Sequence, residues 1–222
     1  MTFDPSSKNR LTRHDLGRFA GGSLFDRLGR AVCAAGCLPR KELYEAWELA
    51  RRVRRRIRGG RVVDVGGGHG LLAVVMLLLD RASPGAVVVD PARPPSAEAL
   101  RLAIAAVWPD LPPVSFAATA LEGFAIARGD VVVSCHACGR LTDRVLDAAI
   151  AAGVPVAVMP CCHDLGARPT TLAGWMDETL AIDTRRALRL EAAGYTVWTA
   201  AIPAAITPKH RVLIGRPPTA PG

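Results

Sequence analysis

A strand, a glycine-rich turn and a helix follow one another without a break in residues 61–79, and this constrains the fold more than any other feature. Residues 61–65 are mostly β-branched and apolar, which is typical of a buried strand. The unbroken apolar run at 71–79 predicts a buried helix. Between them, glycine lets the backbone approach a ligand closely because no Cβ intervenes. Such a unit is typical of the entry to a nucleotide-type site in an α/β fold. The glycines that stand at alternate positions are Gly66, Gly68 and Gly70.

The spacing of these glycines separates two classes of cofactor. The dinucleotide fingerprint needs a third glycine three residues after the second, where this chain has Leu71. The pattern is instead Asp-x-Gly-x-Gly-x-Gly from Asp64 onward. It resembles the first motif of class I S-adenosylmethionine-dependent methyltransferases. The resemblance implies that Asp64 faces the methionine end of the cofactor, which carries an ammonium group. The alternative is a tight turn in some other α/β protein.

A second carboxylate closes the next predicted strand, at 86–89. Asp90 follows it directly, and an acid at this place can accept hydrogen bonds from both ribose hydroxyls. In the methyltransferase family that is its usual task, so the resemblance implies a ribose-binding role. The alternative is a strand-end Asp that starts a turn with Pro91. Glu122, after the third strand, is the candidate for the adenine end.

The rest of the chain alternates between strands and helices. The later strands are predicted at 114–117, 130–134, 154–159, 195–200 and 211–214, and the helices between them near 96–107, 142–152 and 181–193. We therefore predict an α/β fold, a Rossmann-like seven-stranded methyltransferase sheet with helices on both faces. A helical basic N-terminal segment (1–58) precedes the methyltransferase domain (59–216), and a flexible tail follows (217–222). The resemblance implies that the seventh strand is antiparallel and lies beside the fifth.

Positive charge is concentrated ahead of the first sheet strand. Residues 1–61 hold 15 Lys and Arg against 6 Asp and Glu, a net charge of +9, whereas the rest of the chain carries −1. The excess is greatest in Arg51–Arg58, where apolar residues at helical spacing predict an amphipathic helix that begins after Pro39 and ends at Gly59-Gly60. Its arginines are expected to face water. They form either a solvated helix face or a phosphate-binding surface for RNA.

Cysteine and histidine follow two predicted strands. Residues 134–139 read Ser-Cys-His-Ala-Cys-Gly, and residues 159–164 read Met-Pro-Cys-Cys-His-Asp. Ligands of open α/β sheets bind at the carboxyl ends of the strands, so these groups are expected beside the transferred methyl. We predict that four of them line the acceptor pocket as catalytic residues: Cys135, His136, Cys161 and His163. Two other interpretations remain, a zinc or iron ion bound by the cluster and simple packing. The adjacency of Cys161 and Cys162 speaks against a shared ion.

These segments carry a narrower resemblance as well. Pro-Cys-Cys-His at 160–163, Ala-Cys-Gly-x-Leu-Thr-Asp at 137–143 and Thr-Pro-Lys-His-Arg at 207–211 resemble a Cys-Cys-His methyltransferase subgroup that includes eukaryotic tRNA ribose 2′-O-methyltransferases. That subgroup often has two consecutive histidines, whereas here Asp164 follows His163. The zinc-finger segments of some eukaryotic relatives are absent.

The sequence therefore predicts an S-adenosylmethionine-dependent methyltransferase with RNA as the favoured acceptor. The alternatives are a small-molecule methyltransferase and a noncatalytic RNA-binding module on the same fold. An apolar run long enough to span a membrane is missing, and residues 1–13 are polar and lack the apolar core of a signal peptide. We accordingly expect a cytoplasmic protein with free thiols.

Overall fold

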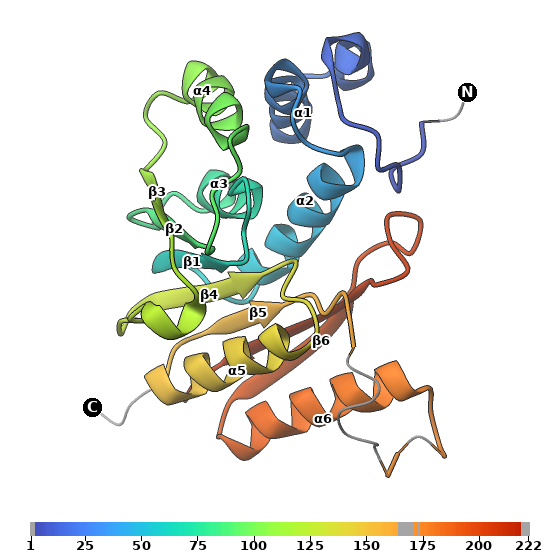
Figure 1. Ribbon diagram of the computed structural model, residues 1–222, viewed down its shortest axis with the longest axis vertical. Coiled ribbons are helices and arrows are strands. Elements are labelled where there is room, and N and C mark those ends of the chain that lie inside the picture. Colours follow the sequence, from blue (N-terminus) through green and yellow to red (C-terminus); the bar gives the residue numbers. More distant parts are fainter. Residues whose placement is uncertain (1–2, 164–170, 173, 219–222) are drawn as a thin grey trace.

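The computed structural model describes residues 3–163, 171–172 and 174–218, and Figure 1 shows its arrangement. The centre is a seven-stranded sheet in the order β3-β2-β1-β4-β5-β7-β6. Strands β1 to β5 run parallel, whereas β7 is antiparallel to both β5 and β6. The predicted sheet and the antiparallel seventh strand are confirmed. The strands are β1 (Arg61–Val65), β2 (Ala86–Val89), β3 (Val114–Ala117), β4 (Asp130–Ser134), β5 (Val156–Val158), β6 (Thr196–Ala201) and β7 (Arg211–Arg216).

Helices cover both faces of the sheet (Figure 1). The first face carries α1 (Leu24–Ala35), α2 (Arg40–Arg54), α3 (Leu71–Leu79) and α4 (Ala97–Val107), and the second carries α5 (Arg140–Ala152) and α6 (Glu178–Ala192). Two short 3-10 helices, η1 (Arg13–Phe19) and η2 (Leu121–Gly123), complete the described elements. Alternate strand residues serve the two cores, because successive side chains of a strand point to opposite faces. In β1, for example, Val62 packs in the first core and Val63 in the second.

The N-terminal segment is helical, as predicted, and it shares its core with the sheet. Leu11, Leu28 and Leu49 are fully buried in the same hydrophobic cluster as Val62 of β1. The chain division at residue 58 stays a prediction, and residues 219–222 of the predicted tail lie outside the described residues. In the part of the chain that is described, no helix is both long and apolar enough to cross a bilayer.

One prediction for the arginine helix is wrong. Arg54 was expected to face water, but its side chain is 2% exposed and lies under α3 and the turn that follows. Its Nη1 lies 3.2 Å from Asp80 Oδ2, its Nη2 donates to Ser83 Oγ at 2.6 Å, and its Nε donates to the Met76 carbonyl at 3.1 Å. The helix also ends at Arg54, earlier than Gly59-Gly60, so this guanidinium anchors the last turn of α2 to the segment before β2.

Three strands differ from their predicted bounds. β6 (Thr196–Ala201) is shifted by one residue from the predicted 195–200, and the other two differ for local reasons. β5 covers only Val156–Val158, because Pro155 and Pro160 flank it and lack the N–H that a ladder needs. β7 extends to Arg216, since its last residues pair with the start of β6. The bounds of β1, β2, β3 and β4 are those predicted.

Candidate active site

The glycine turn after β1 adopts a backbone that other residues rarely take. Gly66, Gly68 and Gly70 have φ values of 65°, 51° and 78°, in the left-handed region. A Cβ on Gly70 would also lie 2.9 Å from Val88 Cγ2. The Gly66 N–H donates to the Val89 carbonyl at 2.8 Å, which joins the turn to the end of β2. The turn therefore presents bare backbone at the carboxyl edge of the sheet.

Gly67 supports the site by a contact that its position in the sequence does not signal. A Cβ there would lie 2.5 Å from both Cγ and Oδ2 of Asp64. The φ of Gly67 is ordinary, so no conformational signal marks it. Only the packing of the turn against the Asp64 carboxylate reveals the requirement for glycine.

Asp64 is fully buried at the end of β1. Its Oδ2 accepts a hydrogen bond from the Ala73 backbone N–H at 3.1 Å, and its Oδ1 finds no partner within the described residues. Burial raises the pKa of Asp64 to about 7, and the nearby charge of Asp90 adds to the rise. A buried carboxylate oxygen without a donor fits a ligand that brings its own positive charge or N–H.

Asp90 lies beside the same turn, at the end of β2. Its Oδ2 accepts from the Gly68 N–H at 3.2 Å, and its Oδ1 accepts from the Ala92 N–H at 3.1 Å. The side chain is half-buried, and a carboxylate oxygen can accept more than one hydrogen bond. The two backbone contacts hold the carboxylate still and leave it acceptor capacity for a ligand's hydroxyl groups.

A cavity of about 280 Å³ opens next to this turn, between α4 and the edge of the sheet. Gly68 and His69 contribute to one end, and Trp108 and Phe116 to its mostly apolar wall. His69 Nε2 lies 2.8 Å from Ser96 Oγ, so the ring points toward the start of α4. Glu122 is exposed and lies 3.0 Å from Arg144 across the surface, and its adenine role stays a prediction.

A second, smaller cavity of about 20 Å³ lies on the other side of the turn, against α2. Asp64, Gly66, Cys135 and His136 line it together with Glu42 of α2. The volume suits a group about the size of one water molecule. This narrow space connects the buried end of Asp64 with the residues that follow β4.

Glu45 is a functional candidate that sequence reasoning missed. Its carboxylate is 3% exposed and lies within 4.8 Å of the Cys135 sulfur and of a His136 nitrogen. Oε1 is 3.3 Å from Lys41 Nζ, and Oε2 is buried without a partner in the described chain. The signal available in the sequence was the spacing of Glu42 and Glu45, which places both on one side of the arginine helix.

The pKa values of the groups around Glu45 are shifted toward the neutral forms of these groups. Burial raises the pKa of Cys135 well above its ordinary value, and the charges of Glu45 and Asp64 add to this. Burial likewise raises the pKa of Glu42, with Glu45 contributing, and it lowers the pKa of His136. Cys135 is thus a thiol at neutral pH, and His136 is an uncharged imidazole that can take up a proton.

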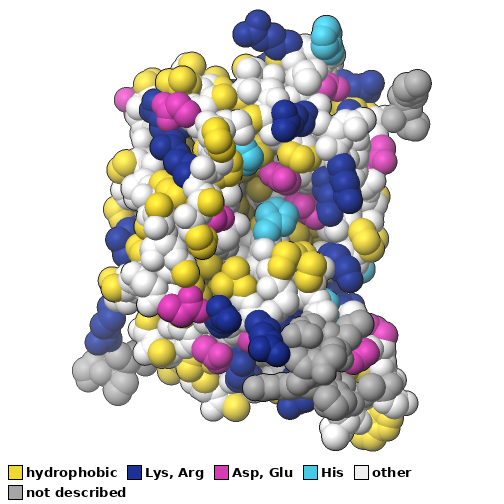
Figure 2. Space-filling model, in the orientation of Figure 1, with side chains coloured by type: hydrophobic (Ala, Val, Ile, Leu, Met, Phe, Trp, Pro, Cys, Tyr) yellow, Lys and Arg dark blue, Asp and Glu magenta, His cyan; other side chains and the backbone are white. Residues whose placement is uncertain are grey.

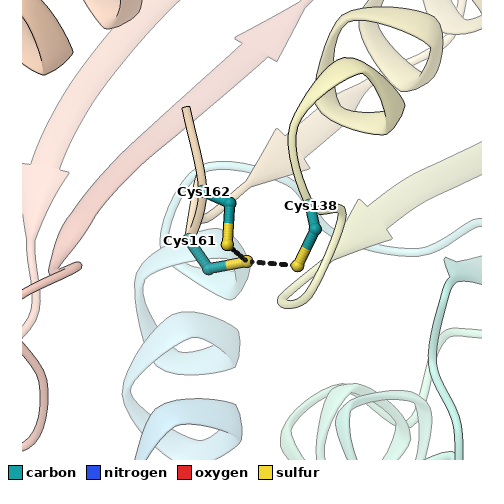
Figure 3. A group of neighbouring side chains, drawn as sticks. All are labelled: Cys138, Cys161 and Cys162. Atoms are coloured by element: carbon teal, nitrogen blue, oxygen red, sulfur yellow. Dashed lines mark hydrogen bonds between the residues drawn. The ribbon is translucent and has the colours of Figure 1, made fainter. Parts of the chain in front are cut away.

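The predicted cluster of cysteines and histidines is divided in the structure. Cys135 and His136 lie with Glu45, whereas Cys138, Cys161 and Cys162 form a separate group of thiols. Figure 3 shows the three sulfurs of that group directed toward one another from the ends of β4 and β5. The catalytic roles of Cys135, His136, Cys161 and His163 stay predictions.

His163 is turned away from both groups. Its side chain is 2% exposed, and its Nε2 lies 2.9 Å from Asp183 Oδ1 on α6. Asp183 also accepts from Arg211 Nε at 2.7 Å and from Arg186 Nη1 at 3.0 Å. Burial alone would raise the pKa of Asp183, but the hydrogen bonds from His163 and Arg211 outweigh it and lower the pKa. Asp164, which follows, lies outside the described residues.

Several arginines of α2 and its extension are engaged within the protein. Arg52 Nε donates to the Ala201 carbonyl at 2.9 Å, Arg58 Nη1 donates to the Leu79 carbonyl at 3.2 Å, and Arg56 lies over the Trp198 ring. Figure 2 shows acidic and histidine side chains near the middle of the visible face, with basic side chains around them. RNA binding by Arg51–Arg58 therefore stays a prediction.

The chain is similar to known methyltransferases in sequence and in fold. A family model described as a methyltransferase domain matches residues 41–168. An O-methyltransferase family protein from Burkholderia thailandensis aligns with a TM-score of 0.54 and 19% identity, over 93% of this chain and 64% of that one. The S-adenosylmethionine-dependent methyltransferase SibL aligns with a TM-score of 0.50 and 21% identity, over 92% and 65%. This chain thus spans less than two thirds of either structure, and these likenesses show the fold. No curated protein matches the sequence.

Proposed function

This chain belongs to the family of methyltransferase domains, and from that premise we propose that it transfers a methyl group from S-adenosylmethionine to an acceptor held between α2 and the ends of β4 and β5. The observation that carries the proposal is Asp64, a fully buried carboxylate at the glycine turn with one oxygen unpartnered among the described residues. A buried group of this kind is costly unless a ligand satisfies it. The residues present therefore fit the cofactor that the family implies.

Each part of the turn would hold one part of that cofactor. Asp64 Oδ1 would accept a hydrogen bond from the ammonium group, and Asp90 would accept from the ribose hydroxyls. Gly66 and Gly68 would allow the backbone to lie against the ligand. S-adenosylmethionine, when bound, supplies a methyl carbon on a positively charged sulfur, which an aligned nucleophile can displace. The protein has to align that nucleophile and accept its proton.

Glu45 and His136 are suited to the proton transfer. An oxygen or nitrogen acceptor loses a proton as its bond to carbon forms, and the proton needs a base within reach. Glu45 Oε2 is buried and unpartnered in the described chain, and the exposed His136 ring has a pKa that partial desolvation lowers. Cys135 beside them stays protonated because burial raises its pKa, so its role would be to form part of the wall of the small cavity beside Asp64.

The acceptor that this geometry favours is a small neutral or cationic molecule. Glu42, which lines the small cavity beside Asp64, and Glu45 place two carboxylates along the same side of α2. A polyanion would be repelled there. RNA is the second candidate, because residues 1–61 carry a net charge of +9 and Arg51, Arg55 and Arg58 are exposed. A noncatalytic module would have no need of the buried Asp64 carboxylate.

Two measurements test the proposal. Calorimetry with S-adenosylhomocysteine should show binding to the wild type, and Asp90→Asn should weaken it by roughly 1.5–3 kcal/mol for each charged hydrogen bond lost. Asp110→Asn, an exposed carboxylate elsewhere, should bind like the wild type. Tritiated methyl transfer should then be compared between a dialysable small-molecule extract and total RNA. If the wild type binds no S-adenosylhomocysteine, the methyltransferase proposal fails; label in RNA alone would favour the second candidate.

A further inference from the structure

Three thiols gather at the carboxyl ends of β4 and β5, and one of them, Cys161, is also among the predicted catalytic residues. Cys138 Sγ lies 2.9 Å from Cys161 Sγ, and Cys161 Sγ lies 3.8 Å from Cys162 Sγ. All three sulfurs lie within 4.8 Å of one another. Figure 3 shows the Cys161 sulfur directed toward Cys138 and the Cys162 sulfur directed toward Cys161, although Cys161 and Cys162 are adjacent in sequence. The sequence-based objection that neighbouring cysteines cannot converge therefore does not apply here.

The backbone that carries these thiols is held by contacts on both sides. The Gly139 N–H donates to the Cys162 carbonyl at 3.3 Å, so the two loops are hydrogen-bonded to each other. Arg186 Nη2 of α6 donates to the Gly139 carbonyl at 3.3 Å. The Met159 N–H donates to the Ser134 carbonyl at 3.0 Å at the ends of the paired strands. These contacts fix the two loops after β4 and β5, so the protein backbone holds the three thiols close together.

Three sulfurs suit a metal ion better than a disulfide. A disulfide would use two of them and leave the third beside it. In a tetrahedral zinc site with Zn–S bonds of about 2.3 Å, neighbouring sulfurs lie about 3.8 Å apart, and the observed separations of 2.9 and 3.8 Å, with all sulfurs within 4.8 Å, bracket that value. Cys138 and Cys162 are exposed, which gives an ion access from solvent.

Ligand chemistry leads to the same conclusion. A bound dication stabilises thiolates. Soft thiolate ligands select zinc over the harder divalent cations magnesium, calcium and manganese.

We propose that Cys138, Cys161 and Cys162 bind one Zn²⁺ ion as three thiolates, with the fourth position open to a water or solute ligand. Three protein ligands with one open position is the arrangement of zinc sites that exchange ligands. Binding would release the thiol protons and clamp the ends of β4 and β5 together. The site is distinct from the set formed by Glu45, Cys135 and His136, and it does not depend on the proposed methyl transfer.

Zinc binding can be measured without cofactor or acceptor. The reduced full chain should retain one zinc per chain by elemental analysis, and Co²⁺ in its place should give a thiolate-to-cobalt charge-transfer band. Outer-shell changes at metal sites cost about 10–100-fold in affinity, so loss of a ligand in Cys138→Ser or Cys162→Ser should cost more than about 100-fold. Competition with a chromogenic chelator measures this. Cys37→Ala, a buried cysteine outside the group, should bind zinc like the wild type.

Three results would overturn the proposal. The first is reduced wild-type protein that binds no zinc. The second is unchanged affinity in both serine variants when circular dichroism shows them folded. The third is quantitative formation of a Cys138–Cys161 disulfide, seen as the loss of two hydrogen masses, in protein already saturated with zinc. None of these results bears on S-adenosylhomocysteine binding, so failure of the zinc proposal and failure of the proposed function are separable.

Discussion

The Ala73 backbone N–H at the start of α3 donates a hydrogen bond to Asp64 Oδ2 at 3.1 Å, and the other oxygen of this carboxylate has no partner in the described structure. One hydrogen bond is too little to keep a fully buried carboxylate ionised at low pH, because burial favours the neutral acid. The pKa of Asp64 is accordingly raised to about 7. The Asp64 carboxyl group therefore changes its charge near neutral pH, and its attraction for an ammonium ligand changes with it.

Ligand affinity should depend on pH through Asp64. Below a pKa of about 7 the free protein carries a protonated Asp64, so binding an ammonium group must release that proton. We expect the dissociation constant of S-adenosylhomocysteine to rise up to about tenfold per pH unit below neutrality and to level off above it. Calorimetry in buffers of different ionisation enthalpy measures the proton release. In Asp64→Asn the affinity should be lower and this pH dependence should be lost. A wild-type affinity that stays constant between about pH 5 and about pH 8 would contradict the assignment of Asp64 to ammonium binding.

Stability of the ligand-free protein should follow the opposite trend. The folded-state pKa of Asp64 lies above its unfolded value of 3.8, so between about pH 4 and pH 7 the folded state binds more protons. Stability then falls as pH rises through this window. Urea denaturation across the window should show this contribution in the wild type and lack it in Asp64→Asn. A contribution of the opposite sign would show that the carboxylate is stabilised in its charged form.

Gly67→Ala should damage the site although its backbone conformation is ordinary. The new Cβ would lie 2.5 Å from the Asp64 carboxylate, so the carboxylate or the turn must move. We expect a loss of about 1–3 kcal/mol of stability, as for other overpacked positions, and weaker S-adenosylhomocysteine binding. Gly22→Ala is the matched control, because a Cβ there would meet nothing within 4 Å. If both variants bind and melt like the wild type, the Gly67–Asp64 contact has no consequence.

Glu45→Gln should lower turnover more than it lowers cofactor affinity. The amide cannot take a proton from the acceptor, and loss of one general base typically costs about 10²–10⁴-fold in rate. The dissociation constant of S-adenosylhomocysteine should change little, since the proposal assigns cofactor binding to Asp64 and Asp90. Glu48→Gln, on the same helix and paired with Arg51 at 3.2 Å, serves as the control. Equal turnover in the two variants would remove Glu45 from the proton route.

Arg54→Met should destabilise the whole domain. The substitution leaves Asp80, which is 7% exposed, without its guanidinium partner, and breaking a buried pair costs about 3–5 kcal/mol. Arg55→Met, one residue along and exposed, should have little effect. Urea denaturation monitored by circular dichroism compares the two. Equal midpoints would show that the Arg54–Asp80 pair contributes nothing to folding.

Any RNA binding should respond to the exposed arginines of α2 and its extension. Replacing Arg51, Arg55 and Arg58 with Gln should flatten the salt dependence of affinity, because each phosphate contact releases counterions. The same number of exposed arginines elsewhere, Arg81, Arg101 and Arg128, provides the matched control set. Fluorescence anisotropy with a labelled RNA at several salt concentrations measures both slopes. Equal slopes of affinity against salt concentration for the two triple variants would show that the arginines of α2 form only a solvated helix face.

The sequence by itself determined the sheet and the place of Asp64 and Asp90 in it. The bounds of β1, β2, β3 and β4 could be predicted because buried parallel strands are continuous apolar runs, and β5 was predicted too long because of its flanking prolines. Asp64, inside β1, and Asp90, directly after β2, could be placed at one edge of the sheet because the carboxyl ends of parallel strands meet there. These are local patterns, and a local pattern can be read without knowing what packs against it.

Tertiary structure alone decided which side chains gather beside the ends of β4 and β5. Glu45 and Arg54 belong to one helix and appear in sequence among its polar residues, but the packing of α2 on α3 and on the end of β4 buries both. The four cysteines after β4 and β5 looked like one cluster, and a turn between Cys135 and Cys138 separates them into two groups. His163 was placed by its bond to Asp183, twenty residues away. Which side of a helix or loop meets a distant element depends on contacts between segments, and no periodicity within a segment encodes them.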